Sequence, residues 1–153
     1  MRRLTTFVAL AGGVLIFALA GLVTASVLLR WFTGLPISGD FEMVQMGAAL
    51  AVFCFLPFCQ AQRANIVVDT FTSRLSDRAR AVVDAMWDGL YALTMGVIGY
   101  AMLPGVIAAW KSGEETMVSR IPLWPALAIS TALILFLATV AAWTARRLLR
   151  GAR

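Results

Sequence analysis

The chain has 153 residues, of which 61% are hydrophobic and 14% charged, with a formal net charge of +5. Soluble domains are about 45–50% apolar and about 25% charged, so this composition excludes an ordinary soluble protein and indicates a single integral membrane domain, residues 1–153. The arginines lie between apolar runs rather than along one solvated face, so we expect no nucleic-acid partner. The absence of histidine excludes histidine-ligated haem, histidine-bound zinc and histidine acid–base catalysis on this chain.

The first predicted element follows a basic N-terminus that is similar to the start of a secretory signal. Its uncharged run, residues 4–29, has 26 residues, whereas the apolar core of a signal has about 7–15. A helix of that length reaches about 39 Å, more than the roughly 30 Å hydrocarbon core of a bilayer. We therefore predict a first transmembrane helix over residues 4–29.

The second predicted span, residues 41–62, is polar at its start and basic just after its end. Glu42 and Gln45 are three residues apart and share a helix face. We expect this pair either to hydrogen-bond another helix or to contact a partner. Pro57 lies in the last turns, where it should kink or loosen the helix.

The two cysteines, Cys54 and Cys59, lie in this span. Five residues of helix rise about 7.5 Å, which lies outside the roughly 4.4–6.8 Å range of Cα separations in disulfides. We interpret both as buried small apolar residues. The alternative is a membrane thiol oxidoreductase that uses this pair.

A short amphipathic helix is predicted between the second and third spans, at about residues 67–76. Phe71, Leu75 and Ala79 recur at intervals of four residues on one face, while polar residues point elsewhere. Asp69 is a candidate N-cap for this interfacial helix, and Ser76 for the helix that follows.

The third predicted span, residues 80–110, has Arg80, Asp84 and Asp88 in its first turns, each four residues from the next. We interpret Asp84 as the partner of Arg80, with both carboxylates stabilised near the helix N-terminus. The alternative is that the two aspartates bind a partner helix or an ion.

The fourth predicted span, residues 122–146, is the most uniformly apolar and is followed by arginines. Tryptophans near span ends are predicted to anchor the chain at the membrane surface: Trp110, Trp124 and Trp143. Glycines within the spans are predicted to permit close helix packing: Gly12, Gly13, Gly21, Gly96 and Gly99. The fold class is thus an all-α membrane protein with four transmembrane helices and one interfacial helix.

The distribution of Lys and Arg predicts the orientation. Four spans place both termini on the side that also holds the second connector. That side carries 10 of the 13 basic residues, because only three lie on the other side: Arg30, Lys111 and Arg120. We therefore predict cytoplasmic termini, and arginines of the interfacial helix in contact with anionic phospholipid.

No Asp, Glu, Lys or Arg lies in the middle of any predicted span. The chain therefore lacks an obvious proton relay or a substrate ion pair of its own. It also has no nucleophile motif, phosphate-binding loop or metal-ligand spacing, and we expect no cofactor and no enzymatic activity. An accessory subunit of a larger complex fits best. A self-assembling small exporter remains an alternative beside the thiol oxidoreductase.

Four short motifs occur in order along the chain: ISGDFE at residues 37–42, QRANIVVD at 62–69, LSDR at 75–78 and IPLW at 121–124. With its length and span count, the chain resembles the small membrane subunit of tripartite ATP-independent periplasmic (TRAP) transporters over essentially its whole length. Asn65 stands where family members often have His, and Ser76 where they often have Pro. Because Asn65 does not titrate, the resemblance implies no pH role there.

The resemblance implies a scaffold subunit in the bacterial inner membrane. It implies a large transmembrane permease subunit that carries the substrate and ion sites, and a periplasmic substrate-binding protein that delivers the solute, commonly an organic acid. Import would be driven by an ion gradient, usually sodium. We expect the following residues to serve assembly rather than transport chemistry: Glu42, Gln45, Arg63, Asp69, Asp84 and Asp88.

Overall fold

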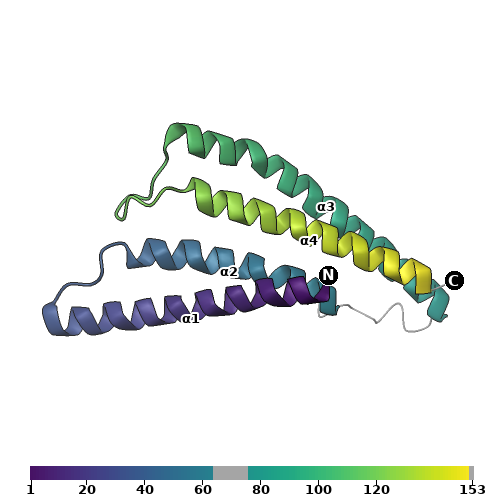
Figure 1. Ribbon diagram of the computed structural model, residues 1–153, viewed down its shortest axis with the longest axis horizontal. Helices are drawn as coiled ribbons and strands as arrows, with labels where there is room; N and C mark the ends of the chain where they lie inside the picture. The colour runs from purple at the N-terminus through teal and green to yellow at the C-terminus, as the bar shows by residue number, and fades with distance from the viewer. Residues whose placement is uncertain (64–75, 152–153) are drawn as a thin grey trace.

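The computed structural model describes residues 1–63 and 76–151, which form four α-helices (Figure 1). These are α1 (Arg2–Thr33), α2 (Asp40–Gln62), α3 (Asp77–Ser112) and α4 (Trp124–Gly151). All four are long and apolar enough to cross a membrane. The predicted all-helical fold with four spans is confirmed. The predicted interfacial helix, apart from Ser76, lies outside the described residues, and so does Asp69.

The helices are longer than the predicted spans at several ends. α1 continues to Thr33 and ends at Gly34, whose φ of 79° is the left-handed conformation common after helices. α3 begins at Asp77, and the hydroxyl of Ser76 accepts a hydrogen bond from the Ala79 N–H at 3.4 Å. This confirms Ser76 as a cap. The 32 residues of α1 and 36 residues of α3 reach about 48 and 54 Å, so both helices exceed the roughly 30 Å hydrocarbon core.

Two antiparallel hairpins make up the fold (Figure 1). α1 packs on α2, α3 packs on α4, and contacts between α2 and α4 join the hairpins. Both chain termini lie at one end, which we call the terminal end. The connections α1–α2 and α3–α4 lie at the opposite end, which we call the loop end. The terminal end therefore also holds the end of α2 and the start of α3.

The core is small and centres on α4. Leu137, Val140 and Ala141 are at most 1% exposed, and Ala51 of α2 is fully buried. Large apolar side chains of α1 and α3 point outward instead, and Phe17 is 81% exposed. Exposed apolar surface of this extent suits lipid or another apolar helix, not water.

Three glycines permit close contact between helices, two of them between α1 and α2 and one between α3 and α4. A Cβ at Gly12 would lie 2.7 Å from the Cβ of Cys54, and one at Gly99 would lie 2.6 Å from Cδ2 of Leu135. The predicted packing role of Gly12 and Gly99 is confirmed. Gly47, which the sequence analysis missed, meets Leu19 in the same way. The prediction is wrong for three others, around which the described residues leave open space: Gly13, Gly21 and Gly96.

Gly12 and Gly13 therefore form a matched pair for testing the α1–α2 contact. Gly12→Ala should lower the free energy of unfolding by about 1–3 kcal/mol relative to Gly13→Ala, because only the first methyl overpacks the interface. Both changes gain the same helix propensity, so the difference isolates packing. Thermal unfolding of the purified chain in detergent measures it. Equal stability of the two variants would contradict the described helix contact.

Candidate functional site

At the loop end, one carboxylate links the two hairpins. Oε1 of Glu42 accepts a hydrogen bond from the Val118 N–H and Oε2 accepts one from the Ser119 N–H, both at 2.9 Å. Glu42 lies in the first turn of α2, where the helix dipole favours a negative charge. Glu42 thus contacts the α3–α4 loop of its own chain, which is neither the hydrogen bond to another helix nor the partner contact that the sequence leaves open.

The α1–α2 connection is held at the same place. The Ser26 hydroxyl of α1 donates to the carboxylate of Asp40 and accepts a hydrogen bond from the Ile37 N–H at 3.2 Å. Gly39 has a φ of 75°, and a Cβ there would overlap the Ser119 side chain. Glycine suits this position because the backbone is left-handed and because no room is left for a side chain. The α1–α2 connection and the α3–α4 loop therefore pack directly on each other.

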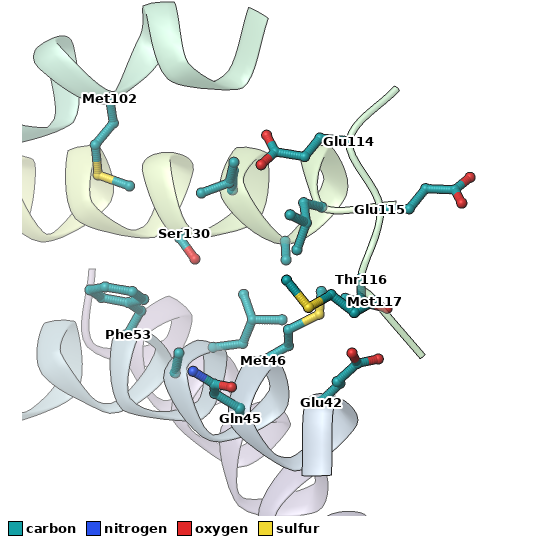
Figure 2. Close-up of a pocket in the computed structure, with 15 residues that line it drawn as sticks. Glu42, Gln45, Met46, Phe53, Met102, Glu114, Glu115, Thr116, Met117 and Ser130 are labelled. Atoms are coloured by element: carbon teal, nitrogen blue, oxygen red, sulfur yellow. The ribbon is translucent and has the colours of Figure 1, made fainter. Parts of the chain in front are cut away.

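A cavity of about 520 Å³ lies beside this contact, between α2 and α4 (Figure 2). Its walls are mainly apolar, with Met46 and Phe53 on α2 and Leu127 on α4. Gln45 lines it, and the Ser130 hydroxyl points toward it from α4. The carboxylates at its rim are Glu42, Glu114 and Glu115. Glu42 and Gln45 therefore share this cavity, as their spacing predicts.

At the terminal end, Gln60 links three helices. Its side chain is 2% exposed, and its Nε2 donates to Oδ1 of Asp88 on α3 at 2.9 Å and to the Thr144 hydroxyl on α4 at 3.5 Å. The other oxygen of Asp88, Oδ2, is buried and accepts no hydrogen bond from the described residues. Asp88 lies about three turns into α3, so it is farther from a helix end than any other carboxylate among the described residues.

An ion pair lies next to this network. Nη2 of Arg63 is 2.6 Å from Oδ2 of Asp84. Arg63 ends α2 with a φ of 54°, a left-handed conformation that costs a non-glycine residue about 1–2 kcal/mol. The sequence predicts Arg80 as the partner of Asp84, whereas the partner in the structure is Arg63, on another helix. Spacing along one helix cannot reveal a contact that depends on how α2 and α3 meet.

The predicted assembly residues therefore fall into two groups at opposite ends of the bundle. Glu42 and Gln45 lie at the loop end, and Arg63, Asp84 and Asp88 at the terminal end. Their role in assembly stays a prediction. Three polar residues in the same contacts were not predicted from the sequence: Ser26, Gln60 and Thr144. The position of Gln60 inside an apolar span, three residues before Arg63, was a usable signal.

The predicted tryptophan anchors lie near helix ends. Trp110 is in the last turns of α3 and Trp124 begins α4, and they are 65% and 40% exposed. Trp143 lies toward the terminal end, where the guanidinium carbon of Arg147 sits 4.8 Å from its ring centroid. These positions suit amphipathic rings at headgroup level, and the anchoring itself stays a prediction.

The cysteines are both free and half-buried. Cys54 faces Gly12 of α1 and so fills a packing position. Across residues 1–63 and 76–151, no three potential metal ligands of the His, Cys, Asp or Glu type lie together.

Four apolar spans with their polar contacts at the two ends define a multi-pass membrane subunit. The chain belongs to the DctQ component family of the tripartite ATP-independent periplasmic transporters, whose family model matches residues 19–153. It is therefore a small permease subunit of a TRAP transporter, as the resemblance implies. No curated protein and no solved structure shows a significant match to the chain.

The Glu42 contact predicts a local effect on the α3–α4 loop. Glu42→Ala should speed hydrogen exchange at the Val118 and Ser119 amides, because both lose their acceptor. Glu42→Gln keeps one carbonyl oxygen and should have a smaller effect. Hydrogen–deuterium exchange with mass spectrometry of peptides covering residues 116–120 measures this.

Glu115→Ala is the matched control, since it removes the same charge from the cavity rim and accepts no hydrogen bond from these two amides. If Glu115→Ala and Glu42→Ala accelerate exchange equally, the loop responds to charge and not to this contact.

Proposed function

We propose that this chain is the scaffold subunit of a secondary-active solute importer and does not itself carry the substrate. A large transmembrane permease subunit holds the substrate and ion sites, and a sodium gradient drives import. A periplasmic substrate-binding protein delivers the solute, an organic acid. The small subunit enlarges the fixed, membrane-embedded part of the transporter.

This proposal rests on where the polar groups lie and on which groups they bind. Residues 4–29, 43–62, 89–110 and 121–145 contain no charge, so most of each of the four spans lacks a group that could pair with a charged solute or ion. The carboxylates of Glu42 and Asp84 are engaged within the chain, by the α3–α4 loop and by Arg63. These groups make structural contacts within the chain, as expected of a scaffold subunit that does not bind the solute.

The outer faces of α1 and α3 support the same function. Phe7, Val14 and Phe17 on α1 are each more than 65% exposed, and so is Leu93 on α3. The chain therefore has a wide apolar perimeter around a small core. Such a perimeter suits a subunit that adds membrane-embedded area to a larger partner.

The transport complex tests this function. The tagged full-length chain, purified from its host in mild detergent, should bring down a large polytopic protein, and liposomes that contain the chain alone should show no uptake. Glu42→Ala and Arg63→Ala should lower the yield of the complex before they change substrate preference. Glu115→Ala serves as a control that should leave the yield unchanged.

Uptake by the isolated chain in liposomes would contradict the scaffold function. Altered substrate preference in a complex of normal yield would contradict the assembly role of Glu42 and Arg63.

For orientation, we propose that the terminal end faces the cytoplasm of a bacterial inner membrane. Both termini lie at that end (Figure 1), and basic residues at membrane-span ends are retained on the cytoplasmic side. The loop end has three basic residues in its helix ends and connections: Arg30, Lys111 and Arg120. The terminal end has more: Arg2, Arg3, Arg63, Arg78, Arg80, Arg146, Arg147 and Arg150.

Reporter fusions test this orientation. A green fluorescent protein fused after the C-terminus should fluoresce, because it folds in the cytoplasm. Alkaline phosphatase fused after Ser38 should be active, because it requires the periplasm. An inactive phosphatase fusion together with a dark C-terminal fusion, at normal expression, would reverse the assignment.

A further inference from the structure

A second cavity, of about 210 Å³, lies at the terminal end. It opens between the ends of α2 and α4, and two guanidinium groups line it, those of Arg63 and Arg147. The other described residues of its wall are Ala61, Thr144 and Leu148. The cavity is thus basic on one part of its wall and apolar on another.

Both arginines are held in place by contacts outside the cavity. Arg63 pairs with Asp84 at 2.6 Å and adopts a left-handed backbone conformation at the end of α2. Arg147 stacks on Trp143 at 4.8 Å. A guanidinium group has five N–H donors, so neither contact uses all of them. Because these contacts already restrict the two side chains, they lose less conformational entropy when they bind a ligand.

The charge balance of the cavity is positive. None of the described residues that line it is acidic, and the carboxylate of Asp84 pairs with Arg63. In the part of the chain that the structure describes, Arg147 forms no ion pair. The Thr144 hydroxyl already donates to the Val140 carbonyl at 2.8 Å and accepts from Gln60. Among the described residues of the wall, the two guanidinium groups are therefore the polar groups that the cavity offers to a ligand.

The position of the cavity along the membrane normal indicates which class of anionic ligand it binds. It lies where the uncharged run of residues 121–145 gives way to arginines, which is the level of the lipid headgroups. Basic pockets between transmembrane helices at this level bind anionic headgroups. The volume equals that of roughly seven water molecules at about 30 Å³ each, which is room for a phosphodiester and its glycerol linkage.

We propose that this cavity binds the phosphodiester headgroup of an anionic phospholipid, phosphatidylglycerol or cardiolipin. The planar donors of Arg63 and Arg147 bind phosphate oxygens in the bidentate way that arginine favours. Ala61 and Leu148 contact the glycerol and the first methylenes of the acyl chains. The bound lipid bridges α2 and α4, and so it stabilises the contact that joins the two hairpins.

Native mass spectrometry of the full-length chain, or of its complex with the large subunit, tests the proposal. The protein is titrated with phosphatidylglycerol, with phosphatidylcholine and with inorganic phosphate. Arg147→Gln should weaken the first phosphatidylglycerol by about tenfold, as expected for the loss of a hydrogen-bonded charge. Arg147→Lys should lie between this variant and the parent chain, because it keeps the charge and loses the planar fork.

The control variant is Arg150→Gln, which removes the same charge from an exposed position of α4 that does not line the cavity. Its affinity for phosphatidylglycerol should stay within about twofold of the parent chain. Equal losses in Arg147→Gln and Arg150→Gln would overturn the proposal in favour of diffuse attraction. Equal binding of phosphatidylcholine would overturn it, and so would displacement of the lipid by inorganic phosphate at matched concentration.

Discussion

The fold depends on how its two hairpins are joined. α1 packs on α2 and α3 on α4, and in the described part of the chain α2 packs on α4 across the hairpins and contacts α3 through side chains at its end. The hydrophobic effect does not drive helices together in a bilayer, where lipid chains are as apolar as the side chains. Close packing and interhelical hydrogen bonds must do so instead. The structure provides both, with glycines at the helix crossings and polar links at each end of the α2–α4 contact.

The positions of these polar links explain how a chain of this composition can be a rigid element of the membrane. A polar group at the bilayer centre is costly, whereas one near a helix end stays within reach of headgroups and water. Glu42 and Gln60 lie near opposite ends of α2, and each reaches the other hairpin. The long apolar middle of α2 then needs only shape complementarity, which its fully buried Ala51 illustrates.

Much of this architecture could be predicted from the sequence, because the number of spans follows from uncharged runs longer than a bilayer. Ser76 was also predictable as a cap, since its chemistry is local. The partners of Glu42 and Asp84 were not, because both lie on other elements of the fold and depend on how the hairpins cross. Among glycines, Gly12 and Gly13 look alike in sequence, and only the direction of their Cα–H bonds in the folded bundle separates them.

The two ends differ in how completely their carboxylates are satisfied. At the loop end, both oxygens of Glu42 accept backbone hydrogen bonds at 2.9 Å, although the Ser119 hydroxyl beside it is buried without a hydrogen-bond partner among the described residues. At the terminal end, Oδ2 of Asp88 is buried without a hydrogen-bond donor among the described residues, an arrangement that costs about 1–3 kcal/mol. Arg147 likewise stacks on Trp143 without an acidic partner in the described part of the chain. Among the described residues, the terminal end therefore retains a carboxylate oxygen without a donor and an arginine without an acidic partner. The phospholipid that we propose would bind to that arginine.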